Sequence, residues 1–118
     1  MDRHLHTCLM IDFYGQLLTK KQYEILDMYF NNDYSLSEIS DFLGISRQAV
    51  SDNKNRAMDS LLKYEEMLGL AGRCEELNAT AGNTIRLLDM LKTSSMDDED
   101  KEIISKIRDA LKKIIKEI

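Results

Sequence analysis

Apolar residues recur along this 118-residue chain at intervals of three and four, which is the spacing of one face of an α-helix. Between residues 5 and 18 the pattern predicts a first helix whose buried face carries Leu5, Leu9, Met10, Phe13, Tyr14 and Leu17. The chain has no proline and only five glycines, and two of these, Gly69 and Gly72, lie near its middle. We therefore expect long helices separated by a short hinge.

Capping residues predict where the next three helices begin. Residues 19–22 and 35–38 each fit the capping box, in which a hydroxyl and a Glu or Gln three residues later bond each other's backbone N–H groups. Ser46 predicts a further N-cap, and the helix that it opens meets no breaker before Leu68. Gly44 is expected to end the helix before it, with three apolar side chains turned inward: Ile39, Phe42 and Leu43.

The C-terminal third continues the helical pattern. A helix is predicted from about residue 75 to residue 92, followed by a polar break at residues 93–95 and a last helix that opens at Asp97. The acidic residues after Asp97 and the lysines near the end of the chain both suit the dipole of this last helix. The whole chain is therefore predicted to be all-α.

Residues 36–64 have the spacing of a helix-turn-helix. Ser40 is a small residue where two steeply crossing helices bring their backbones together, and Gly44 tolerates the positive φ of a tight turn. Apolar residues lie on both sides of the turn: Ile39, Leu43, Ile45, Val50, Ala57 and Leu61. We expect a helix-turn-helix domain over residues 1–68 and a helical packing or dimerisation region over residues 69–118.

The face of the second helix opposite Val50 is polar. In helix-turn-helix proteins the N-terminal part of this helix enters the major groove. Arg47 has the donors to bond guanine, Gln48 has the groups to bond adenine, and Ser46 with its backbone N–H suits a phosphate. The predicted DNA-binding residues are Ser46, Arg47, Gln48, Ser51, Asp52, Lys54 and Asn55. The alternative for Gln48, Ser51 and Asn55 is a solvated helix face.

Charge argues against one kind of DNA binding. The net charge is −5, and residues 1–66 hold seven Lys and Arg against eleven Asp and Glu, so the chain does not coat nucleic acid through bulk positive charge. Residues 46–56 nevertheless carry three positive charges and one negative charge. The negative residue, Asp52, is repelled by phosphates unless it accepts from cytosine or pairs with a neighbour, and Arg56 is its expected partner.

Two resemblances rest on these residues. The stretch EISDFLGISRQAV, followed by RAMDSLL, resembles region four of bacterial sigma factors. The order of features from Phe13-Tyr14 through residues 17–22, 33–39 and 46–50 to Asp52-Asn53 more closely resembles the YlxM-type helix-turn-helix proteins of Gram-positive bacteria. That resemblance implies a small cytoplasmic regulator, encoded beside the signal-recognition-particle GTPase and serving protein targeting.

The last helix has an apolar stripe that must be buried. Its members recur at three and four residues, and the predicted dimer interface is Ile104, Ile107, Leu111, Ile114 and Ile118. The stripe either packs against a helix of the same chain or joins two copies in a homodimer, whose twofold axis would set the spacing of two DNA-binding surfaces. We predict the homodimer.

The remaining chemistry-bearing residues indicate neither an enzyme nor a cofactor. Cys8 and Cys74 stand alone and are expected to be mostly buried thiols, while His4 and His6 lack the further ligands that a metal site needs. There is no apolar run long enough to span a bilayer and no signal sequence, so we expect a cytoplasmic protein. Two functions stay open: a DNA-binding regulator, or a helical adaptor that binds a protein or RNA of the targeting particle.

Overall fold

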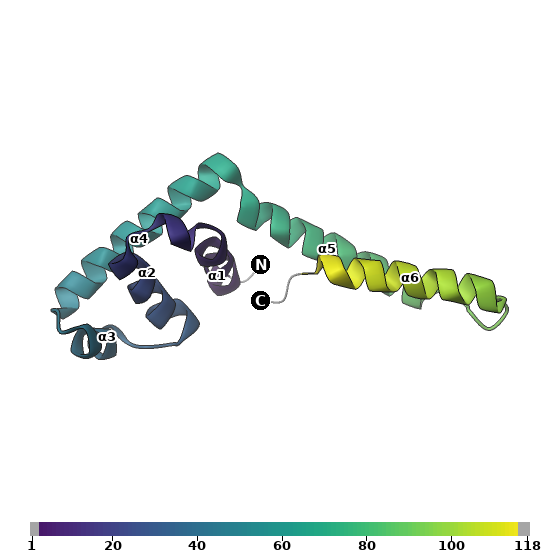
Figure 1. Cartoon of the computed structure of the whole chain (residues 1–118), viewed down its shortest axis with the longest axis horizontal. Helices are drawn as coiled ribbons and strands as arrows, with labels where there is room; N and C mark the ends of the chain where they lie inside the picture. The colour runs from purple at the N-terminus through teal and green to yellow at the C-terminus, as the bar shows by residue number, and fades with distance from the viewer. Residues whose placement is uncertain (1–2, 116–118) are drawn as a thin grey trace. The chain divides into compact units, whose positions relative to one another are not determined.

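A computed structural model of the chain describes residues 3–115, which form six α-helices and no strand (Figure 1). This confirms the predicted all-α class. The backbone divides into two compact units, one reaching to Gly72 and the other beginning at Arg73. The helices are α1 (Arg3–Tyr14), α2 (Lys20–Leu26), α3 (Leu36–Leu43), α4 (Arg47–Leu68), α5 (Leu70–Asp89) and α6 (Asp98–Ile114). No helix within the described residues is both long and apolar enough to cross a membrane.

The predicted helix starts are confirmed. Thr19 and Ser35 each form a complete capping box, the first with Gln22 and the second with Glu38. Ser46 caps α4 by accepting from the N–H of Ala49 at 3.0 Å. These bonds satisfy N–H groups that a helix start leaves without a partner, so local sequence fixes the three boundaries.

The first helix is shorter than predicted. α1 ends at Tyr14, and a 3₁₀ turn over Gly15–Leu17 follows it. Leu17, which the periodicity placed on the buried face, is 57% exposed. The reason is the ring of Tyr23, which lies so close that a Cβ at Gly15 would come within 2.7 Å of it. The chain turns at Gly15, against the ring of Tyr23, and the apolar face of α1 ends at this turn.

A core of its own holds the N-terminal unit together. Ile25 of α2, Ile39 of α3 and Val50 of α4 are fully buried and form one cluster. Partly buried side chains surround them: Met28, Tyr29, Leu36, Leu43 and Ile45. Further along α4, Ala57 and Leu61 are also fully buried, as is Leu9 of α1. The cluster therefore joins α2, α3 and α4, and this packing orients α3 against α4.

The inward orientation predicted for Phe42 is wrong, because this side chain is 72% exposed. At about 100° per residue, Leu36 and Leu43 lie on one side of Ile39 and Phe42 lies on the other. The buried face of α3 is the side of Leu36 and Leu43, which pack against the core cluster. The three-residue step from Ile39 to Phe42 thus carries Phe42 out of the core.

The hinge between α4 and α5 is also shorter than predicted. It consists of Gly69 alone, with φ +65°, and α5 begins at Leu70 instead of near residue 75. The reason is the carboxylate of Glu65, which accepts from the backbone N–H groups of Ala71 and Gly72, each at 3.0 Å. Because a side chain of the preceding helix satisfies these N–H groups, α5 starts directly after the glycine.

The hydroxyl of Tyr14 completes this arrangement, which we call the Glu65 clasp: Tyr14, Glu65 and the backbone of residues 70–72. Tyr14 donates to Glu65 Oε1 at 2.7 Å and accepts from the N–H of Leu70 at 3.1 Å. Burial raises the pKa of Tyr14, and the carboxylate raises it further. Burial also acts to raise the pKa of Glu65, but the donated hydrogen bonds outweigh it and lower that pKa.

The C-terminal unit contains most of α5 together with α6, and the later part of α6 lies beside the end of α5 (Figure 1). Arg108 of α6 donates to Asp89 of α5 at 2.7 Å. Asp97 caps α6 by accepting from the N–H of Asp100. Among the described residues of this unit, Ala81 alone is a buried hydrophobic residue, so this pair lacks a core comparable to that of the N-terminal unit.

Candidate nucleic-acid interface

The turn between α3 and α4 is held by Gly44 and Ser40. Gly44 has φ +69° and ψ +31°, a left-handed conformation that suits glycine, and its N–H donates to the carbonyl of Ser40 at 2.9 Å. The Ser40 hydroxyl donates to the carbonyl of Ile45, on the far side of the turn. Ser40 therefore does more than leave room for a helix crossing, because its hydroxyl bridges the corner.

Replacing Gly44 by alanine is expected to lower the free energy of unfolding of the N-terminal unit by about 1–2 kcal/mol, since a Cβ is strained at positive φ. A Cβ at this position would meet no other atom within 4 Å, so the cost comes from the backbone alone. Asparagine tolerates the left-handed region, and Gly44→Asn should therefore cost less than Gly44→Ala. Urea denaturation followed by tyrosine fluorescence measures both, and equal losses would contradict this explanation.

The first turns of α4 present a polar surface. Val50, Ala57 and Leu61 are fully buried, so the opposite face of the helix points outward. We call the seven predicted DNA-binding residues at the start of this helix the α4 face. It contains Ser46, Arg47, Gln48, Asp52 and Asn55, which are exposed, and Ser51 and Lys54, which are half-buried. The seven predicted DNA-binding residues thus all lie at the start of α4, and Ser46 and Lys54, each four residues from Val50, lie nearer the buried side of the helix than the others.

Three residues of the α4 face have side-chain partners. Gln48 donates through Nε2 to Asp52 Oδ1 at 3.0 Å, so the partner of Asp52 is Gln48 and not Arg56 as the spacing predicts. The ammonium of Lys54 lies 4.6 Å from the ring centre of Tyr29, a cation–π contact. Tyr29 lies in a π-helical turn, Asp27–Asn31, that no sequence pattern predicts.

The side chain of Asn53 forms a hydrogen bond within α4. Its Nδ2 donates to the carbonyl of Ala49 at 2.8 Å, and the side chain is half-buried. A polar residue is therefore accommodated at this half-buried position, because its amide is satisfied within the same helix.

Acidic and basic residues occupy different segments of the N-terminal unit. Residues 22–46 contain five acidic residues and no Lys or Arg, namely Glu24, Asp27, Asp33, Glu38 and Asp41. Residues 46–56 carry three positive charges and one negative charge. The start of α4 is therefore a locally basic surface beside an acidic one, and an anion would meet attraction at α4 and repulsion at α3.

The other residues of interest lie away from this surface. Within the described part of the chain, no cluster of His, Cys, Asp and Glu has the makings of a metal site. Cys8 and Cys74 are half-buried, less than expected, and Cys8 Sγ lies 3.6 Å from His4 Nε2. Of the predicted dimer residues, Ile104 and Leu111 are half-buried and Ile107 and Ile114 are exposed, while Ile118 lies outside the described residues.

Comparison with known proteins agrees with this geometry. Residues 1–116 match the family model described as "Putative helix-turn-helix protein, YlxM / p13 like", whose members carry the designation UPF0122. A UPF0122 protein of Acetivibrio thermocellus is 43% identical over 115 residues, which cover 98% of each chain. Another, of Oceanobacillus iheyensis, is 38% identical over 109 residues, covering 92% of this chain and 97% of the relative.

Proposed function

The chain belongs to the UPF0122 family of YlxM/p13-like helix-turn-helix proteins, and from that membership we propose that it is a DNA-binding regulatory protein. The observation that carries the proposal is the α4 face. Its donors and acceptors point outward at the start of a helix, while Val50 beneath them is fully buried. This is the arrangement by which recognition helices enter the major groove.

Four residues of the α4 face have a proposed role. Arg47 bonds guanine, since its guanidinium offers two parallel donors, and Ser46 with the first N–H groups of α4 binds a phosphate. Asp52 bonds the amino group of cytosine, because the one bond from Gln48 leaves its second oxygen available as an acceptor. The cation–π contact with Tyr29 positions Lys54, which contacts the phosphate backbone beside the groove.

A salt series with duplex DNA tests the proposal. The wild-type chain should bind a pool of duplexes at low salt, with affinity falling linearly in log–log form as salt rises. Arg47→Ala should weaken binding by about 1–3 kcal/mol, which is the usual worth of a bidentate base contact. Lys21→Ala, an equal loss of charge on α2, is the matched control and should change binding little. Absence of binding at low salt, or equal losses in both variants, would overturn the proposal.

A second candidate is a helical adaptor that binds a protein or RNA component of the signal recognition particle. The acidic stretch at residues 22–46 favours it, because a negative surface suits a basic protein better than a phosphate backbone. In the same salt series, duplex DNA would then be ignored while the purified particle protein or its RNA binds. DNA binding that depends on Arg47 would instead favour the regulator.

We also propose how the protein is organised around this activity. Residues 1–68 form the DNA-binding domain and residues 69–118 the region that joins two chains into a homodimer. The dimer would hold two α4 faces, and consecutive major grooves lie about 34 Å apart on one side of a duplex. The proposed role is non-catalytic, needs no cofactor, and belongs to the cytoplasm, where the chain would meet either proposed partner.

A further inference from the structure

The C-terminal unit leaves apolar side chains uncovered on both of its helices. Leu77 and Leu87 of α5 are 57% and 63% exposed, and Leu91, two residues beyond the helix end, is 47% exposed. On α6, Ile103, Ile107 and Ile114 are 49%, 43% and 49% exposed. Helices of about this length owe most of their stability to burying one face, and among the described residues from Arg73 onward Ala81 alone is a buried hydrophobic residue.

The apolar residues of α6, together with Arg108, form two adjacent stripes. One contains Ile104, Arg108, Leu111 and Ile115, which are all half-buried, and Arg108 bonds Asp89, so this stripe faces α5. The other contains Ile103, Ile107, Ala110 and Ile114, which are all exposed. We call this second set the outer stripe. The predicted dimer residues are thus split, and only Ile107 and Ile114 among the described ones belong to the outer stripe.

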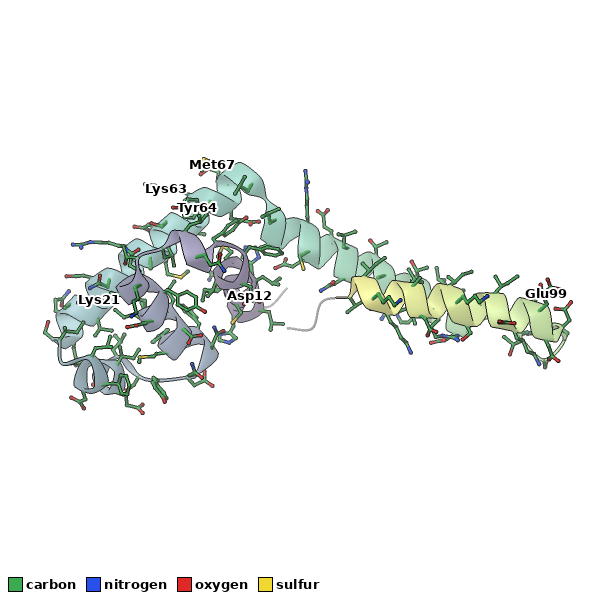
Figure 2. The ribbon with its side chains drawn as sticks, in the orientation of Figure 1. Asp12, Lys21, Lys63, Tyr64, Met67 and Glu99 are labelled. Carbon is green, nitrogen blue, oxygen red and sulfur yellow. The ribbon has the colours of Figure 1, made fainter. Side chains whose placement is uncertain are left out.

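The two ends of α6 carry opposite charges. The first turn carries Asp98, Glu99 and Asp100, and the last turn carries Lys112 and Lys113 (Figure 2 labels Glu99 at the start of the helix). A second α6 running in the same direction would place acidic turns against each other. One running in the opposite direction would place each acidic turn against a basic one.

We propose that the outer stripe of α6 is covered by the same stripe of a second copy of this chain, with the two α6 helices antiparallel about a twofold axis near Ile107. This surface is complementary to itself in apolar packing and in charge, because apolar residues lie in the middle of the helix and opposite charges lie at its two ends. Residues 73–118 hold nine Lys and Arg against ten Asp and Glu, so no excess charge opposes self-association. The inference rests on the homodimer proposed above and does not depend on DNA binding.

Sedimentation equilibrium at low salt tests the pairing. The wild-type chain should have the mass of two copies at micromolar concentration. Lys112→Glu with Lys113→Glu should raise the dissociation constant about tenfold or more, because Lys113, which flanks the outer stripe, would be replaced by an acidic residue facing the partner's acidic first turn. Lys112 lies on the far side of the helix and adds only to the net charge of that end. Glu99→Lys with Asp100→Lys should do the same from the other end. Lys20→Glu with Lys21→Glu makes an equal charge change on α2 and should leave the constant unchanged.

The combined variant with all four substitutions separates this pairing from others. It should dimerise like the wild type, because both ends are reversed together, and a mixture of the two double variants should form heterodimers. Far-UV circular dichroism reports whether α6 stays helical in each variant. A monomeric wild-type chain would overturn both the homodimer and the pairing. A dimer whose dissociation constant ignores the double variants, or which the combined variant fails to restore, would overturn the antiparallel pairing alone.

Discussion

Leu61→Ala is expected to lower the free energy of unfolding of the N-terminal unit by about 2–5 kcal/mol, as large-to-small changes in a packed core do. Leu61 is fully buried, on the face of α4 that also carries Val50 and Ala57. Losing its side chain removes apolar burial and leaves a cavity that the neighbouring helices fill only in part. Because the same packing sets the direction of the α4 face, DNA binding should weaken as well.

The chain supplies a matched control at the next position. Leu62 is 52% exposed, so Leu62→Ala should change the free energy of unfolding by no more than about 0.5 kcal/mol. All five tyrosines lie between residues 14 and 64 and the chain has no tryptophan, so tyrosine fluorescence in a urea titration reports the N-terminal unit selectively. Equal losses in the two variants would mean that α4 does not pack on the core as described.

The local boundaries of the fold were predictable because the residues that make them are neighbours in sequence. Thr19, Ser35 and Ser46 bond backbone groups three residues away, and Gly44 adopts its left-handed conformation within a single turn. No contact from elsewhere in the chain is needed for any of these. Hydroxyl caps and a glycine stop therefore predict helix ends from the sequence alone.

The features that the sequence did not predict depend on residues far apart in the chain. The ring of Tyr23 ends α1 at Gly15, and a carboxylate at Glu65 together with a hydroxyl at Tyr14 starts α5 five residues early. Tyr14 and Glu65 are 51 positions apart, so no periodic pattern relates them. Even so, an acidic residue four positions before a glycine hinge is a signal that would justify looking for a cap on the following helix.

The candidate site was predictable in its position and less so in its bonds. The burial of Val50 and the exposure of Arg47 follow from the helical spacing at which the apolar residues of α4 recur. We expected Arg56 as the partner of Asp52 from its spacing, but Gln48 is also four residues away, and the structure selects Gln48. Periodicity gives the face of a side chain but does not choose between equivalent neighbours on it.

Glu65→Gln is expected to lower the free energy of unfolding at pH 7 by about 1–3 kcal/mol, the cost of leaving buried hydrogen-bonding groups without their partners. The carboxylate accepts from the Tyr14 hydroxyl and from two backbone N–H groups, using both of its oxygens. An amide has one acceptor oxygen, and its NH₂ would face a donor. Glu66→Gln changes the next, exposed residue in the same way and should have little effect.

The same clasp sets a direction for the pH dependence. The hydrogen bonds to Glu65 lower its pKa in the folded chain despite its burial, so its stabilisation is complete above the unfolded pKa of about 4.3. That contribution disappears as the pH falls through the lower, folded pKa. Urea titrations at pH 7 and pH 3 should therefore show the gap between wild type and Glu65→Gln narrowing in acid. A gap that stayed constant, or that widened at pH 3, would mean that the ionised carboxylate is not what holds the start of α5.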